Sequence, residues 1–152
     1  MKRRRRSGFT FVELMIVMTI VGILAAIAVP KYIDLKRRAN TTKVLGDFEA
    51  VRVAVMSFYA DSSYFPVESA AGDIPPHLQK YLPVGFRFQN SQWSLDYENW
   101  DVGKQDFTNA NALIGVTVTT QDPELGEATS RIMGNVPQFS VGNKYTFMIS
   151  GI

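Results

Sequence analysis

Glu13 is the residue of greatest chemical interest, because it places a carboxylate inside an otherwise apolar stretch. Residues 9–29 include only four positions outside the apolar set: Thr10, Glu13, Thr19 and Gly22. As a helix, a stretch of this length can cross a hydrocarbon core about 30 Å thick. An ionised acid is costly in that environment, so its presence marks Glu13 as a candidate functional residue.

The other reactive side chains form no catalytic pattern. The only histidine, His77, follows Pro75 and Pro76 and has no identifiable partner, which favours a surface or turn residue. The chain has no phosphate-binding glycine loop, metalloprotease helix or nucleophile elbow. It also has no cysteine, which excludes disulfides, cysteine nucleophiles and cysteine metal sites. The sequence therefore predicts a protein that is not an enzyme.

Positive charge is concentrated before the apolar stretch. The first six residues carry five positive charges, whereas residues 9–152 have 11 Lys and Arg against 14 Asp and Glu. A basic run that directly precedes an apolar span is typical of a membrane segment with a cytoplasmic amino terminus, so no nucleic acid is required to explain it. Further basic residues follow the span: Lys31, Lys36, Arg37, Arg38 and Lys43. Charge alone therefore does not fix the orientation.

The apolar pattern beyond residue 30 predicts that the helix continues into a folded body. Apolar residues recur there at alternating steps of four and three: Val44, Phe48, Val51, Val55 and Phe58. This spacing places them in one stripe along a helix that reaches about residue 60. Pro30 lacks a backbone donor and Gly22 has a weak helix propensity, so residues 22–30 are expected to be the softest part of the helix.

The rest of the chain predicts a small antiparallel sheet. Turn formers and prolines end the helical pattern after residue 60, and one short helix is expected at 77–81. Four segments rich in aromatic or β-branched residues are expected to be strands: 85–89, 93–97, 113–119 and 145–150. We therefore expect an α+β fold in which the second half of the long helix packs on the sheet.

The residues around Glu13 resemble the processing and assembly signal of type IV pilins and type II secretion pseudopilins. The signal combines a glycine, an aromatic residue directly after it, an acid four positions further on, and a proline beyond an apolar span. In this chain these are Gly8, Phe9, Glu13 and Pro30. Phe11 stands where the family most often has leucine. The resemblance implies a pilin-like fold and a structural subunit of a type IV pilus-like or type II secretion pseudopilus filament.

The same resemblance implies how the chain is processed. A prepilin peptidase would cut between Gly8 and Phe9 on the cytoplasmic face of the inner membrane and methylate the new amino group of Phe9. Residues 1–8 would then be a leader, residues 9–30 the assembly helix, and residues 31–152 the body.

The implied partner of Glu13 is the Phe9 amine of a neighbouring subunit, since an α-amino group is largely cationic at neutral pH. Further implied partners are other copies or related pilins, and an inner-membrane assembly platform from which the subunit enters the filament. Many pilins close a carboxy-terminal loop with a disulfide. This chain has no cysteine, which favours a pseudopilin or a pilin stabilised otherwise.

Two other interpretations of the amino terminus stay open. An export signal with a small-x-small site at residues 26–28 would release a soluble domain, although the apolar run exceeds the roughly 7–15 residues usual for such signals. A plain single-span anchor would carry a membrane-anchored binding module, and it leaves Glu13 unexplained.

The sequence predicts no required cofactor. Calcium is the one metal ion for which it offers candidate ligands. Major pseudopilins often carry calcium in their carboxy-terminal region. Three carboxylates here lie in a segment expected to be a loop around Pro123 and Gly126: Asp122, Glu124 and Glu127. Their spacing matches no dedicated calcium loop, which favours a solvated acidic turn.

Overall fold

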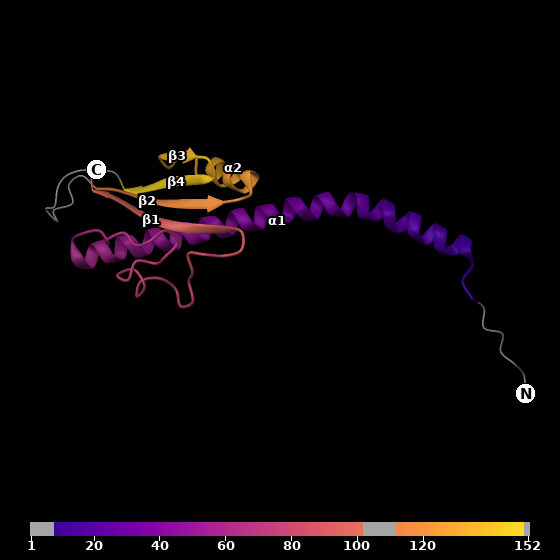
Figure 1. Ribbon diagram of the computed structural model, residues 1–152, viewed down its shortest axis with the longest axis horizontal. Coiled ribbons are helices and arrows are strands. Elements are labelled where there is room, and N and C mark those ends of the chain that lie inside the picture. Colours follow the sequence, from indigo (N-terminus) through magenta and orange to yellow (C-terminus); the bar gives the residue numbers. More distant parts are fainter. Residues whose placement is uncertain (1–7, 102–111, 151–152) are drawn as a thin grey trace, which may run out of the picture. The chain divides into compact units, whose positions relative to one another are not determined.

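The computed structural model describes residues 8–101 and 112–150 of the 152-residue chain. Within these ranges two helices and four strands follow one another along the chain (Figure 1). Their bounds are α1 Phe11–Ser62, β1 Trp93–Asp101, β2 Ala112–Thr120, α2 Pro123–Ile132, β3 Gln138–Val141 and β4 Lys144–Ser150. The chain divides into two compact units, Met1–Ala39 and Asn40–Ile152, and α1 contributes to both.

The first unit contains the apolar half of α1. The helix is long and apolar enough to cross a membrane, and none of its most apolar window is buried within the protein. It continues through Pro30 without interruption, although a proline inside a helix removes one backbone hydrogen bond. The softness predicted for residues 22–30 stays a prediction.

The second unit is built on the predicted stripe of α1. All five stripe residues are buried, and Thr41 and Ala54 are buried with them. The stripe joins one hydrophobic core with residues of the sheet and of the loop that follows α1. Phe48 meets Phe147 of β4 edge to face, with ring centroids 6.0 Å apart. The expected packing of the helix on the sheet is therefore confirmed.

The sheet is antiparallel with the strand order β1-β2-β4-β3. In register, Tyr97 of β1 lies opposite Val116 of β2, and Val116 lies opposite Phe147 of β4. All three side chains are buried, so they form one row of the core across three strands. The α+β class expected from the sequence is confirmed (Figure 1).

Two expected elements are wrong. Segment 85–89 is not a strand: Gly85 has a positive φ of 79°, and only Gln89 makes a bridge, to Ser94. Its alternating phenylalanines serve the core instead, with Phe88 buried. Segment 77–81 forms turns rather than a helix, because prolines at both ends leave room for only a few hydrogen bonds.

Two elements of the structure were not expected. Helix α2 occupies the segment expected to be a loop, with Asp122 as its N-cap and Pro123 in its first turn. Strand β3 pairs with β4 through the two residues Gly142 and Asn143, with Gly142 at a positive φ of 62°. Such a glycine-containing two-residue connection is a hairpin signal, and sequence reasoning missed it.

Candidate assembly site at the start of the long helix

The functional residues predicted from the sequence lie at and just before the first turn of α1. Thr10 Oγ1 accepts a hydrogen bond from Glu13 N at 3.2 Å, and Glu13 Oε2 accepts one from Thr10 N at 2.8 Å. This reciprocal pair is a capping box, in which Thr10 is the N-cap and Glu13 stands three positions later. It satisfies backbone donors that have no partner within the helix.

The hydroxyl of Thr10 also donates to Glu13 Oε2, at 2.9 Å. Both hydrogen bonds that Thr10 donates to the carboxylate therefore converge on Oε2. The other oxygen, Oε1, has no hydrogen-bond partner within residues 8–101 and 112–150. Glu13 is exposed, so this arrangement fixes the direction of the carboxylate while leaving one oxygen accessible to a cation from another molecule.

Gly8 and Phe9 lie immediately before α1 and are exposed. Phe9 is 83% exposed, and a Cβ added to Gly8 would meet no atom within 4 Å. The fold therefore places no steric demand on Gly8. A requirement for glycine at this position would have to come from another molecule that binds this segment.

The site is continued by an uncovered apolar helix surface. The large apolar residues between positions 11 and 29 are exposed, including Phe11 at 76% and Met18 at 73%. The polar Thr19 donates its hydroxyl to Met15 O at 2.8 Å and so needs no outside partner. An apolar surface of this extent requires a membrane or another protein to cover it.

Gly22 and Pro30 lie further along the same helix and are not part of the capping geometry. A Cβ at Gly22 would meet nothing within 4 Å, so this glycine is not required by packing within the described chain. Sequence reasoning found Glu13 but missed Thr10. The signal was available, because a threonine followed three residues later by glutamate is the sequence pattern of a capping box.

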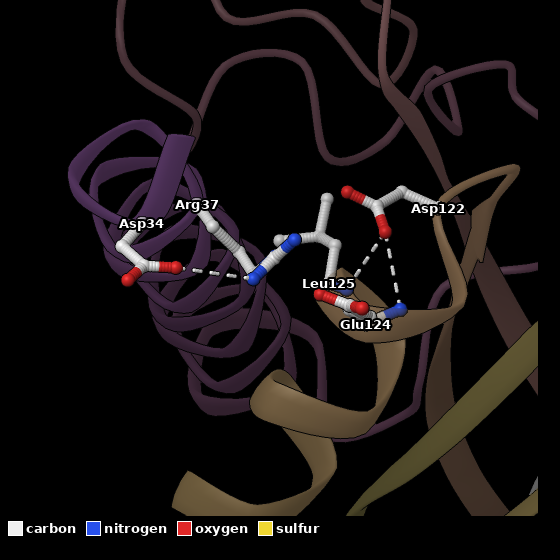
Figure 2. A network of polar contacts seen from close by, with 5 residues as sticks. All are labelled: Asp34, Arg37, Asp122, Glu124 and Leu125. Carbon is white, nitrogen blue, oxygen red and sulfur yellow. Dashed lines mark hydrogen bonds and ion pairs between the residues drawn. The ribbon is translucent and has the colours of Figure 1, made fainter. Parts of the chain in front are cut away.

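The three carboxylates considered for calcium belong to α2 rather than to a loop. Asp122 Oδ1 accepts from the backbone N of Glu124 at 3.1 Å and of Leu125 at 3.3 Å, as Figure 2 shows. Asp122 thus has a capping role that explains its place in the sequence. Within the described residues no three His, Cys, Asp or Glu side chains gather in a way that could hold a metal ion. The expectation that no cofactor is required stays a prediction.

The segment that follows the apolar stretch carries its own ion pair. Arg37 Nη1 lies 3.6 Å from Asp34 Oδ1, one turn apart on α1 (Figure 2). The Asp34 side chain is largely exposed, so the pair contributes little to stability, about 0.3–0.5 kcal/mol for pairs of this kind.

A capped apolar helix followed by an α+β body is a pilin-like layout. A model of the family described as prokaryotic N-terminal methylation motif matches residues 3–29. The chain is 31% identical over 107 residues to type II secretion system core protein G of Klebsiella michiganensis, covering 64% of this chain and 75% of that protein. The chain belongs to this family of type II secretion pseudopilins.

Two further relatives show how far the similarity extends. Core protein G of Klebsiella pneumoniae is 27% identical over 135 residues, which cover 83% of this chain and 96% of that protein. Type IV major pilin protein PilE1 of Neisseria gonorrhoeae is 41% identical over 71 residues, covering 47% of this chain and 33% of that protein. No solved structure matches the chain. The chain is thus a structural filament subunit with an amino-terminal methylation motif.

Proposed function

We propose that this chain is a subunit of a type II secretion pseudopilus, cut after Gly8, methylated on Phe9 and assembled through Glu13. The observation that carries the proposal is the carboxylate of Glu13, held by Thr10 through Oε2 with Oε1 accessible. A cationic amine on Phe9 of a neighbouring subunit would complete the hydrogen bonding of this carboxylate as apolar helices bundle.

The proposed route begins in the inner membrane, with the amino terminus in the cytoplasm and the body on the other side. The leader carries the basic residues that hold this orientation. After processing by a prepilin peptidase, the subunit would leave the membrane through an assembly platform and join other copies or related pilins. No step of this route asks the chain itself to catalyse a reaction.

Pairing in the filament would select one register of neighbouring helices. A charged pair inside an apolar bundle is tolerated when it is complete, and a shift of one helix along the other would leave both charges without a partner. The capping box supports this role, because its hydrogen bonds restrict the Glu13 side chain to one conformation at the helix end.

A pilus rather than a secretion pseudopilus is the second candidate. The pilin PilE1 is more similar than the K. pneumoniae core protein G over the matched residues, but the match covers less than half of this chain. Core protein G is similar over most of the chain, which favours the secretion filament. A plain membrane anchor or an exported soluble domain would leave Glu13 with a helix-capping role alone.

Mass spectrometry of the mature amino terminus tests the processing step. The proposal expects a chain that begins with methylated Phe9. An uncut Met1 would favour the membrane-anchored module, and a start at Val29 would favour the exported domain. Gly8→Leu is the matched variant, because the structure has room for a larger side chain at this position. It should leave the leader attached without unfolding the protein, and mature-sized Gly8→Leu protein at normal levels would contradict the assigned cut.

A further inference from the structure

The segment that follows the apolar stretch of α1 is strongly basic. Residues 31–38 contain four cations, Lys31, Lys36, Arg37 and Arg38, against the single carboxylate of Asp34, which gives a net charge of +3. The proposed pairing of Phe9 with Glu13 makes no use of these charges. Basic residues are usually in excess on the cytoplasmic side of a membrane span, whereas these would lie on the opposite side. They therefore need an explanation of their own.

The basic residues lie on more than one side of the helix. Successive residues of an α-helix are about 100° apart, so Lys36, Arg37 and Arg38 face three different directions. Lys31 lies seven positions before Arg38 and shares its face. Lys31, Lys36 and Arg38 are exposed, and Arg37 forms an ion pair with Asp34 on the same helix. Exposed positive charge therefore lies on more than one side of this segment.

The position of residues 31–38 along the helix matches the headgroup layer of a bilayer. Residues 9–29 span about 30 Å at about 1.5 Å per residue, which is the thickness of the hydrocarbon core. Residues 31–38 follow within about 3–14 Å of its end, where phospholipid headgroups lie. Long basic side chains at the end of a membrane helix extend readily toward phosphate groups.

Exposed apolar side chains stand between the basic ones. Tyr32 is 67% exposed, Ile33 48% and Leu35 66%. Tyrosine is enriched at the boundary between hydrocarbon and water, where its ring and its hydroxyl both find favourable surroundings. A nucleic-acid surface would not require exposed isoleucine and leucine between its cations. The mixture of residues favours a lipid interface.

We propose that residues 31–38 form a basic collar that binds the phosphate groups of anionic phospholipids at the end of the membrane span opposite the leader. The inference rests on the proposed membrane span and on neither cleavage nor filament formation. The collar would enrich anionic lipid around each subunit and hold the subunit at a fixed depth. Its lipid contacts would have to be released when the subunit leaves the membrane.

The chain contains no cysteine, so Ile33→Cys gives a single labelling site within the collar. The full chain carrying a bimane fluorophore at this site is reconstituted in phosphatidylcholine vesicles that contain either brominated phosphatidylglycerol or brominated phosphatidylcholine at equal mole fraction. The ratio of quenching by the two lipids measures local enrichment of the anionic one. The leader charges lie across the bilayer, roughly 30 Å from the label, and do not contribute.

We expect brominated phosphatidylglycerol to quench about threefold more strongly than brominated phosphatidylcholine, and the excess to fall as salt is raised. Replacing Lys31, Lys36 and Arg38 together by Gln should bring the ratio close to one. The matched control replaces three cations of the body, Lys80, Arg87 and Arg131, by Gln and should leave the ratio unchanged. It removes the same charge from positions far along the sequence from the collar.

Equal quenching by both lipids in the parent chain, or an unchanged ratio in the collar variant, would overturn the proposal. Absence of quenching by either lipid would overturn the membrane span and the collar together. A chain that is not cut or does not form filaments would still give the expected ratio, so failure of the proposed processing is distinguishable from failure of the collar.

Discussion

Thr10 and Glu13 show how a polar pair can be accommodated at the end of an apolar helix. The threonine hydroxyl donates to the carboxylate and accepts from the backbone N of Glu13, and the carboxylate accepts from the backbone N of Thr10. These two backbone donors are therefore satisfied before any partner arrives. A cap of this kind stabilises helices independently of filament formation. Its contribution can therefore be measured on the separate subunit.

Thr10→Val should loosen the first turn of α1, because valine has the shape of threonine without its hydroxyl. Loss of an N-cap typically costs about 1 kcal/mol, which corresponds to roughly fivefold faster exchange of the amide hydrogens of residues 11–14. Thr10→Ser retains the hydroxyl and is the matched control. Equal exchange in the Val and Ser variants, measured in detergent micelles by mass spectrometry, would show that the cap contributes nothing.

Asp96 on β1 is a partly buried carboxylate whose charged form is disfavoured by its surroundings. Its Oδ1 is buried and has no hydrogen-bond partner within the described residues. Burial, followed by the neighbouring charge of Glu98, raises the pKa of Asp96 to about 6. The folded state therefore holds this proton more tightly than the unfolded chain. The resulting stability is complete below the ordinary pKa of 3.8 and is lost as pH rises through 6.

Asp96→Asn should remove this pH dependence. We expect the variant to gain about 1 kcal/mol at pH 7.5 and almost nothing at pH 4, a figure reduced from the full effect of the shift because the site is partly exposed. Urea unfolding of the body at both pH values is the measurement. A loss of stability at pH 7.5 would mean that Asp96 makes a favourable contact that outweighs its burial.

At the scale of elements, α2 depends on a glycine in its interior. A Cβ added at Gly126 would lie 2.1 Å from a ring carbon of Tyr145. Gly126→Ala should therefore destabilise the body by about 1–3 kcal/mol, because Tyr145 must move out of its place against the helix. Gly46→Ala in α1 is the matched control. No atom lies within 4 Å there, so the higher helix propensity of alanine should stabilise by about 0.5–1 kcal/mol. Thermal unfolding that shows the same sign for both variants would contradict this account of α2.

The elements that sequence reasoning found are those with a long or repeated pattern. The stripe of α1 covers more than four turns, and β2 and β4 are dense in β-branched and aromatic residues, so periodicity and composition identify them. Helix α2 was missed because Gly126 weakens its local propensity, and only contact with Tyr145 explains that glycine. Segment 85–89 was assigned to a strand because its phenylalanines alternate. The segment is not a strand because its backbone forms a bridge only at Gln89, and this pairing depends on tertiary structure that the local sequence does not reveal.

The candidate site was predictable for a different reason. Glu13 is conspicuous because it contradicts its surroundings, and the glycine and aromatic residue before it belong to the same short motif. The capping role of Thr10 is equally local, because a threonine three residues before a glutamate is the pattern of a capping box, but the charge pattern alone does not indicate it. The place of Asp122 at the start of α2 was hidden by the expectation of a loop.

For the whole molecule, we expect the body to fold without the apolar stretch. The buried core begins at Thr41 and includes no residue of the first unit. A fragment that begins at Lys36 should therefore be soluble and monomeric, with a circular-dichroism spectrum of mixed helix and strand. An all-helical spectrum would contradict the α+β fold. A stable oligomer would show that the body contributes more to assembly than the apolar helix requires.

The most direct test of the whole account is the fraction of mature Glu13→Gln subunit that enters filaments. Glutamine at this position can still accept from Thr10 N and complete the capping box, but it carries no charge for a neighbouring Phe9 amine. We predict that Glu13→Gln and Glu13→Leu both accumulate as cut, methylated subunits in the membrane and are at least tenfold depleted, as a rough estimate, from sheared or crosslinked filaments. Normal incorporation of Glu13→Gln, with failure of Glu13→Leu alone, would show that Glu13 serves only as a helix cap and would contradict pairing between subunits.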